Sequence, residues 1–303
     1  MKKKILITGS NGLLGQKLVH LIAKSDYELI ATARGENRMI FQEGYTYVQM
    51  DISVESDVNK VLEKYQPDYV INTAAMTNVD QCEEDKDGCD LLNVTAVQYL
   101  VNACSKLNIH LIHVSTDFIF DGENGPYLEE ATPNPISYYG ESKLKAEEIV
   151  KKCSSPWAIA RTVLVYGITE GMSRSNIILW VKNSIESKKA INVVNDQWRT
   201  PTLAEDLAQG CFLIATHNAT GIYNISGEDF LNPYQMAIFT ADYFNLDKSF
   251  ITESDGSKFS QTAKRPPKTG FIIDKAKKEL GFKPHSFKEG IQILDEQMKK
   301  LNA

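Results

Sequence analysis

Tyr139 and Lys143 are the two side chains whose types and spacing point most directly to chemistry. They stand in the segment YGESK, four positions apart in a helical pattern, so both side chains face the same way. A free tyrosine, with a pKa of about 10, is a poor acid at neutral pH. A lysine ammonium about 5 Å away, at an effective dielectric constant of about 20, favours the phenolate by about 3 kcal/mol, or roughly two pKa units. The pair predicts a proton-transfer site, although the same spacing also arises by chance on solvated helix faces.

A second polar group, Ser115, Thr116 and Asp117, follows the apolar segment that begins at His110. Open α/β sheets present their catalytic groups at the carboxyl ends of parallel strands, and we expect a strand to end here. A hydroxyl at this place can hydrogen-bond a substrate oxygen beside the phenol. The alternative is a buried Ser-Thr pair that satisfies backbone groups.

Three glycines, Gly9, Gly12 and Gly15, separate a strand pattern from a helix pattern near the N-terminus. Such a turn brings backbone N–H groups and a helix N-terminus against a pyrophosphate only if side chains stay away. The spacing Gly-x-x-Gly-x-x-Gly differs from the Gly-x-Gly-x-x-Gly dehydrogenase fingerprint, and a turn without a ligand is the alternative. We predict a dinucleotide site, which also includes Asn11, Leu13 and Leu14.

The end of the second predicted strand indicates which dinucleotide is bound. An acidic residue there would favour NAD through the ribose 2′-hydroxyl. This chain instead has Arg34, with Arg38 close behind, and an arginine can pair with a 2′-phosphate. We predict NADPH, with Arg34 as the first candidate and Arg38 as the second. The alternative is that both are ordinary surface arginines and that NADH is used.

The elements that must position these residues alternate between strand and helix patterns up to Gly167. This rhythm predicts an α/β fold, a Rossmann-type doubly wound parallel sheet, with a smaller α+β domain built mostly from the C-terminal third. We place residues 1–167 and about 192–226 in the dinucleotide domain. Residues from about 168 to 191 and 227–303 form the second domain.

Composition narrows the class of protein. The chain has 303 residues, a net charge of −6 and 43% hydrophobic residues, which is typical of a globular protein and argues against a nucleic-acid surface. The apolar run Ile5–Ile7 is too short for a signal peptide, and no stretch approaches a membrane span. The five cysteines form no metal-binding pair and the five histidines show no metal-ligand spacing. We expect a cytoplasmic protein with reduced cysteines and no metal site.

Several segments together resemble one family. TGSNGLLG, NTAAMTNVD, STDFIFDG, YYGESKLKAE, RTVLVYG, NDQWRTPT and RPP are similar to the extended short-chain dehydrogenase/reductase superfamily, and within it to the dTDP-4-dehydrorhamnose reductases. The resemblance covers nearly the whole chain. It implies an NADPH-dependent reductase of the 4-keto group of a nucleotide-activated 6-deoxy sugar, with the smaller domain binding the sugar nucleotide.

The resemblance also assigns residues. Thr116, Tyr139 and Lys143 fall on the family's catalytic triad, in which the tyrosine donates a proton to the keto oxygen and the lysine also holds the nicotinamide ribose. The expected cofactor contacts further include Asp51, Ile52, Thr73, Ala74 and Ala75. The expected substrate-side residues are Thr77, Val79, Asp80, Asp117, Gln197, Thr202 and Arg265. Asn93 corresponds either to the family's helix asparagine or to a structural cap.

At three places on the sugar side of the predicted site, this sequence departs from the pattern of the reductases. Leu164 stands where the reductases usually carry tryptophan, Arg199 stands where they carry glycine, and GMSRSNI replaces an Asn-Asn-Phe stretch. The alternatives are a sugar-nucleotide epimerase or dehydratase of the same superfamily, or a non-catalytic NADP-binding subunit like the methionine adenosyltransferase beta subunit. Some members use Mg²⁺ and many form homodimers, but nothing in this sequence specifies a magnesium site or a dimer interface.

Overall fold

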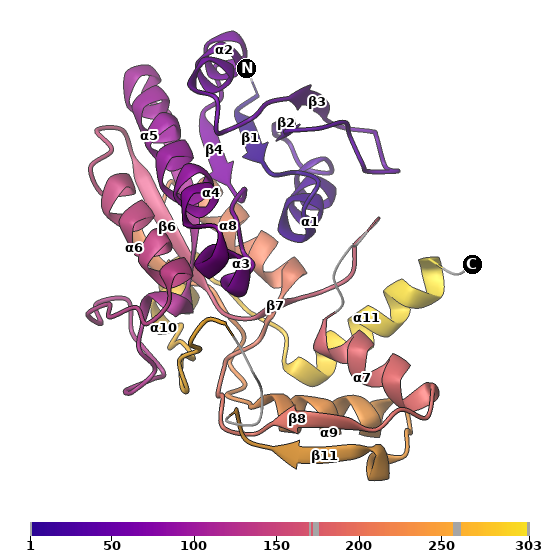
Figure 1. Cartoon of the computed structure of the whole chain (residues 1–303). Coiled ribbons are helices and arrows are strands. Elements are labelled where there is room, and N and C mark those ends of the chain that lie inside the picture. The colour runs from indigo at the N-terminus through magenta and orange to yellow at the C-terminus, as the bar shows by residue number, and fades with distance from the viewer. Residues whose placement is uncertain (1, 170, 172–175, 257–261, 302–303) are drawn as a thin grey trace.

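The computed structural model describes residues 2–169, 171, 176–256 and 262–301. A large lobe is built on a seven-stranded parallel sheet, and a smaller lobe lies beside the carboxyl ends of its strands (Figure 1). The replacement stretch GMSRSNI lies mostly outside the described residues.

The strand order of the central sheet is β3-β2-β1-β4-β5-β6-β10, which contains the doubly wound order and confirms the predicted fold class. The strands are β1 (Lys4–Thr8), β2 (Glu28–Ala33), β3 (Thr46–Gln49), β4 (Tyr69–Asn72), β5 (His110–Thr116), β6 (Trp157–Thr162) and β10 (Gly221–Asn224). Central strands such as β1 and β4 are buried over almost their full length, which explains their continuous apolar runs.

Helices cover both faces of this sheet, as Figure 1 shows. One hydrophobic cluster packs α1 (Leu13–Ile22), α8 (Ala204–Thr216) and α10 (Asp274–Leu280) against one face. The other cluster packs α2 (Glu55–Tyr65), α5 (Ala96–Leu107) and α6 (Tyr138–Val150) against the opposite face. The packing of α6 against the sheet determines the position of its polar side chains.

The smaller lobe contains α7 (Ile177–Glu186), α9 (Pro233–Tyr243) and α11 (Phe287–Leu301) around two further clusters of buried residues. In it, β8 (Ile191–Val194) pairs in parallel with β11 (Ile251–Ser254), next to the short helix η3 (Lys248–Phe250). The predicted boundary near residue 192 places most of β8 in the dinucleotide domain, whereas the structure pairs it with the smaller lobe. Phe271 and Phe282, assigned to the second domain from the sequence, pack in the core of the large lobe.

Short elements line the region between the lobes. They are α3 (Val79–Glu84), α4 (Lys86–Asp90), the π-helix η1 (Leu91–Thr95), the 3₁₀ turn η2 (Asp117–Ile119), β7 (Val165–Tyr166) and β9 (Thr202–Leu203). The π-helix η1 continues directly into α5. Within the described chain, no helix combines the length and apolar character needed to cross a membrane.

Candidate active site

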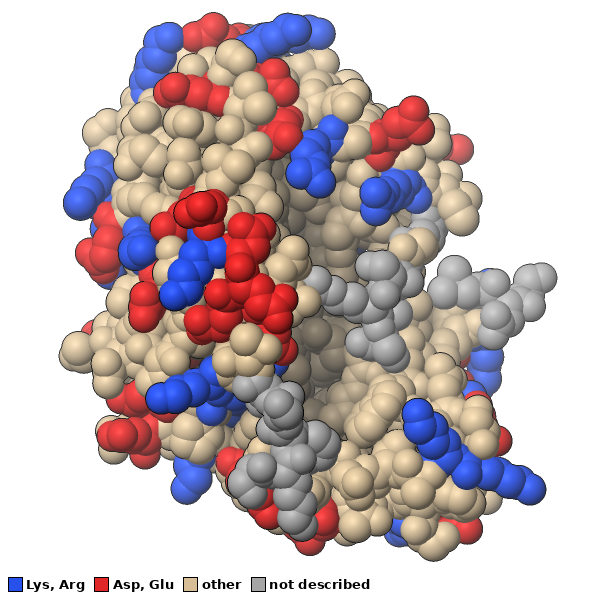
Figure 2. Space-filling model, in the orientation of Figure 1, with Lys and Arg blue, Asp and Glu red and all other residues tan. Residues whose placement is uncertain are grey.

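A cleft runs between the two lobes at the carboxyl edge of the central sheet, and acidic side chains gather on its rim over α3 and α4 (Figure 2). The ends of β1, β2, β4 and β5 all open toward this edge, because the strands are parallel. Residues far apart in the sequence therefore meet here.

The glycine turn after β1 has the geometry of a phosphate cradle. Gly9 has a left-handed φ of +69°, and a Cβ on Gly15 would overlap the carbonyl oxygen of Gly9. A Cβ on Gly12 would instead meet only one atom, Gly9 O at 3.3 Å, so this side of the turn is open. Gly12 caps α1 without a side-chain hydrogen bond, and Leu13 and Leu14 follow in its first turn. The N–H groups there can receive an anion, so the residues present fit a dinucleotide pyrophosphate.

Asn11 connects this turn to the arginine segment. Its Nδ2 donates to Glu36 O at 2.8 Å, and its Oδ1 accepts from Arg38 N at 3.0 Å. Arg34 and Arg38 are both exposed, and no described carboxylate forms an ion pair with either guanidinium. The two cations are available to a ligand that lies along the end of β2.

The remaining cofactor-side residues flank the same edge. Asp51 Oδ1 accepts hydrogen bonds from the amide and hydroxyl of Ser53, which forms a turn beside the buried Ile52. Thr73 Oγ1 donates to Thr8 O at 2.6 Å. Ala74 and Ala75 follow it with small side chains in the half-buried loop after β4, next to the glycine turn. This loop leaves space beside the cradle.

Tyr139, Lys143 and Thr116 are brought together by the packing of α6 on β5. Tyr139 is buried, its ring packs edge-on against Phe118 at 5.6 Å, and a hydrogen bond with Thr116 favours its ionised form. Lys143 Nζ donates to Val114 O at 2.7 Å. Thr116 Oγ1 also lies 3.1 Å from Asp117 Oδ1, an alternative acceptor for its single hydroxyl proton.

Two pKa shifts describe the electrostatics of this group. Burial raises the pKa of Tyr139 above its ordinary value, and the nearby Asp117 adds to this effect. The expected lowering of the Tyr139 pKa by Lys143 does not appear in this structure, where burial sets the direction of the shift. Burial also lowers the pKa of Lys143 to about 8, although Glu147 and Cys89 oppose the shift. Tyr139 thus keeps its proton at neutral pH, and the pKa of the neighbouring Lys143 lies closer to neutrality than that of a free lysine.

Gly140 allows α6 to approach the turn that follows Thr116. A Cβ at this position would overlap Phe118 O and lie 3.0 Å from the Pro135 Cβ. The start of α6 is fixed by Ser137, whose hydroxyl accepts from Gly140 N at 3.2 Å. This close approach places the phenol of Tyr139 next to Thr116.

We expect Gly140→Ala to destabilise the protein by about 1–3 kcal/mol, because the methyl group forces backbone apart in a packed region. It should also lower kcat by moving Tyr139 away from Thr116. Thermal denaturation and turnover measure the two effects. Gly35→Ala is the matched control for stability, since nothing lies within 4 Å of its added Cβ. Equal stability of the two variants would contradict the proposed close approach.

Asp117 is enclosed rather than open to the cleft. Its side chain is 2% exposed, accepts a hydrogen bond from Thr269 and lies 3.6 Å from Arg199 Nε. Arg199 also donates to Trp198 O and Pro266 O. Burial raises the pKa of Asp117, and Arg199 and Thr269 oppose that shift. Sequence reasoning noted Arg199 only as a departure from the family pattern and missed Thr269, which no motif marks.

Asp80 and Arg265, which are 185 residues apart in the sequence, form a bidentate ion pair. Arg265 Nη2 lies 2.7 Å from Asp80 Oδ2, and Ala263 N donates to Asp80 Oδ1. The arginine hydrogen bond lowers the pKa of Asp80. Thr77 is exposed just before α3, and Val79 begins that helix, half-buried near Tyr139. The structure brings these four substrate-side candidates to one rim.

The other two substrate-side candidates differ in accessibility. Gln197 is half-buried at the start of the segment that leads to Arg199. Thr202 is fully buried, and its hydroxyl donates to Val163 O at 2.7 Å. This geometry gives Thr202 a packing role between β6 and β9 rather than a side chain open to the cleft.

Asn93 joins the loop after β4 to α6. Its amide accepts from Met76 N at 2.8 Å and donates to Ser142 Oγ at 3.0 Å. The side chain is 1% exposed. Asn93 therefore fixes the wall of the site without reaching the cleft.

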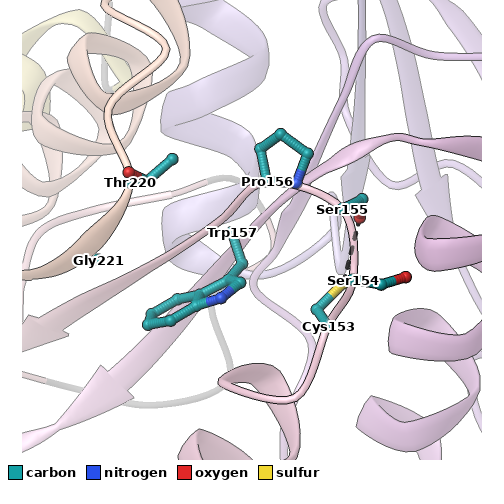
Figure 3. A pocket seen from close by; sticks show the side chains of 7 residues that line it. All are labelled: Cys153, Ser154, Ser155, Pro156, Trp157, Thr220 and Gly221. Carbon is teal, nitrogen blue, oxygen red and sulfur yellow. Dashed lines mark hydrogen bonds between the residues drawn. The ribbon is translucent and has the colours of Figure 1, made fainter.

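A shallow pocket of about 520 Å³ lies at the opposite end of the sheet, between the start of β6 and β10. Figure 3 shows the flat indole of Trp157 beside Pro156 and Thr220 in this pocket. None of the predicted site residues lines it. Across the described parts of the chain, no group of three His, Cys, Asp or Glu residues could hold a metal ion, so Mg²⁺ finds no support.

Comparison with known proteins agrees with this geometry. The family model "RmlD substrate binding domain" matches residues 2–299. The spore coat polysaccharide biosynthesis protein SpsK of Bacillus subtilis is 30% identical over 95% of each chain. The beta subunit of methionine adenosyltransferase 2 from Xenopus tropicalis is 29% identical, over 82% of this chain and 74% of that protein.

A solved structure gives the cofactor context. The dTDP-4-dehydrorhamnose reductase of Bacillus anthracis in complex with NADP has a TM-score of 0.85 and 25% identity, and the match covers 98% of this chain and 100% of that one. The NADP and the reductase name of this neighbour support a nicotinamide cofactor and an oxidoreductase family. The chain belongs to the RmlD substrate binding domain family, within the extended short-chain dehydrogenases/reductases.

Proposed function

We propose that the protein is an NADPH-dependent reductase of the 4-keto group of a nucleotide-activated 6-deoxy sugar, of the type that converts dTDP-4-dehydrorhamnose to dTDP-L-rhamnose. The observation that carries this proposal is the buried set of Thr116, Tyr139 and Lys143 at the sheet edge that also holds the glycine cradle. The enzymatic name of the Bacillus anthracis structure supports the same reaction class.

In this mechanism each residue has a defined task. When bound, the reduced nicotinamide supplies a hydride to C4 of the sugar. Tyr139 donates its hydroxyl proton to the keto oxygen, which becomes the new hydroxyl group, and Thr116 orients that oxygen by a hydrogen bond. The ammonium of Lys143 stabilises the phenolate left on Tyr139 until solvent returns a proton. Burial of these groups limits their contact with water and strengthens each electrostatic interaction.

NADPH oxidation by the purified protein tests the proposal. The assay contains dTDP-4-keto-6-deoxyglucose and the 3,5-epimerase that converts it, and Tyr139→Phe is the negative control. We expect turnover that disappears in the variant. NADPH binding without turnover of this sugar would instead direct the search to another keto sugar, beginning with the neighbourhoods of Leu164 and Arg199.

Arg34 and Arg38 are proposed to select NADPH through its 2′-phosphate. Hydrogen bonds to charged groups contribute about 1.5–3 kcal/mol, so Arg34→Ala should reduce the NADPH/NADH preference in kcat/KM by about ten- to a hundredfold. Arg38→Ala should have a smaller effect, and Lys24→Ala is a surface control remote from the end of β2. An unchanged preference in both arginine variants would show that the 2′-phosphate binds elsewhere.

A second function, a non-catalytic NADP-binding subunit, is supported by the similarity to the methionine adenosyltransferase beta subunit. The same assay separates it from the first, since such a subunit binds NADPH but turns over no keto sugar. An epimerase or dehydratase is disfavoured by the exposed arginines at the end of β2 and by Phe118, which stands where a dehydratase of this superfamily is expected to carry the second acid of an Asp-Glu pair. Tightly retained NAD in the purified protein would favour that alternative.

A further inference from the structure

A row of buried polar side chains crosses three neighbouring strands beneath the site. Thr8 on β1 is aligned with Asn72 on β4, and Asn72 is aligned with His113 on β5. All three are at most 1% exposed. Polar groups at such positions need hydrogen-bond partners, because their desolvation is costly.

The row is continuous and ends at the catalytic lysine. Thr8 Oγ1 donates to Asn72 Oδ1 at 2.5 Å, and the Asn72 amide lies 3.0 Å from His113 Nδ1. At the other side of the imidazole, Lys143 Nζ lies 3.1 Å from His113 Nε2. Thr8 is also the last residue before the glycine turn, so the row connects both halves of the site.

The chemistry of the donors fixes the state of the imidazole. An ammonium can only donate, so a protonated Lys143 requires His113 Nε2 to be an acceptor. Burial and the positive charge of Lys143 hold the pKa of His113 well below its usual range, so the ring is neutral and carries its proton on Nδ1. That N–H faces the Asn72 amide. Turning this amide over lets Asn72 Oδ1 accept from His113 Nδ1 and reverses the contact with Thr8, whose Oγ1 then accepts from Asn72 Nδ2.

We propose, on the basis of the reductase function above, that His113 is a positioning residue that accepts a hydrogen bond from Lys143 and keeps the lysine charged and in place during turnover. Thr8 and Asn72 support this task by holding the imidazole in the required tautomer. In this way, side chains that touch neither substrate nor cofactor fix the position of the glycine turn relative to the catalytic lysine.

Other groups also act on Lys143. Glu147 lies one turn further along α6 and Cys89 lies on α4, and both favour the charged lysine. Tyr139 lies one turn before it on α6, and Arg161 on β6 neutralises Glu147 through an ion pair. Among the described residues, the two acceptors within hydrogen-bond distance of this ammonium are Val114 O and His113 Nε2.

Two amide variants of His113 separate its two contacts. The oxygen of His113→Gln can reach the place of Nε2 and accept from Lys143. The shorter His113→Asn reaches only the place of Nδ1, so it retains the contact with Asn72 and loses the one with Lys143. We expect His113→Asn to move the alkaline limb of the kcat profile to lower pH by about one unit, and His113→Gln to remain near the wild-type profile.

A second readout does not depend on turnover. Carbon-13 NMR of ε-labelled lysines follows the titration of Lys143, whose resonance is identified by its loss in Lys143→Met. The titration midpoint should fall in His113→Asn and recover in His113→Gln. An unchanged midpoint in a folded His113→Asn protein, or equal falls in both variants, would overturn the proposal.

Different results would contradict the reductase function and the proposed role of His113. If the wild-type protein reduces no keto sugar, the reductase function fails, while the NMR titration still decides whether His113 holds Lys143. If His113→Asn does not fold, His113→Met, which has similar length and no nitrogen acceptor, takes its place in the titration. The same fall in midpoint is then expected.

Discussion

Replacing Tyr139 with phenylalanine is expected to lower kcat by about 10²- to 10⁴-fold, the usual contribution of a positioned general acid, while NADPH still binds. Only the hydroxyl is removed from a ring that packs against Phe118, so the fold should be retained. The loss should therefore appear in turnover and not in cofactor affinity or thermal stability. Steady-state kinetics with NADPH titration by fluorescence measures both quantities.

Tyr138→Phe is the matched control for this experiment. Tyr138 precedes the acid in α6, but it is half-buried between Lys86 and Lys145 and points away from Thr116 toward α4. It should retain turnover. If both variants, or neither, lose activity, Tyr139 is not the specific proton donor.

Arg161→Met is expected to destabilise the protein by about 3–5 kcal/mol, because it leaves a buried carboxylate without its partner. Arg161 and Glu147 form a bidentate ion pair with side chains 1% and 0% exposed. The guanidinium also donates to Glu129 O at 2.9 Å, and that bond would be lost as well. Denaturant unfolding followed by circular dichroism measures the change in the free energy of unfolding.

A partly exposed ion pair provides the comparison, since the side chains of Lys182 and Glu186 are 23% and 46% exposed. Lys182 and Glu186 are one turn apart on α7, and Lys182→Met should cost less than about 1 kcal/mol. The double variant Arg161→Met with Glu147→Leu should recover much of the stability, since the pair is replaced by apolar side chains. If Arg161→Met lowered the free energy of unfolding no more than Lys182→Met does, the expected contribution of the buried pair to stability would be contradicted.

The sequence predicted the parts of the fold that depend on local pattern. The apolar runs of β1 and β4 and the glycine turn gave the doubly wound sheet, because parallel strands covered on both faces need such runs. The boundary near residue 192 stays a prediction from pattern alone, since the pairing of β8 with β11 joins segments almost sixty residues apart and leaves no local signal.

In the candidate site, too, features that depend on local sequence pattern could be predicted and features that depend on distant packing could not. Tyr139 and Lys143 could be found because their spacing on one helix is a local property. The enclosure of Asp117 by Thr269 could not, because it depends on where a distant loop returns to β5. The raised pKa of Tyr139 was missed for a related reason: a Coulomb estimate for the lysine pair contains no desolvation term, and burial is visible only in three dimensions.

The path of the chain between the lobes has a consequence for protein engineering. After β6 the chain enters the smaller lobe at α7, returns with α8 and β10, leaves again for α9 and β11, and comes back at Phe271 before α11. The smaller lobe is therefore composed of separate insertions, each anchored at both ends except the last. A single cut cannot release it as an independent fragment, and a chimera that exchanges this lobe between relatives must transplant several segments together.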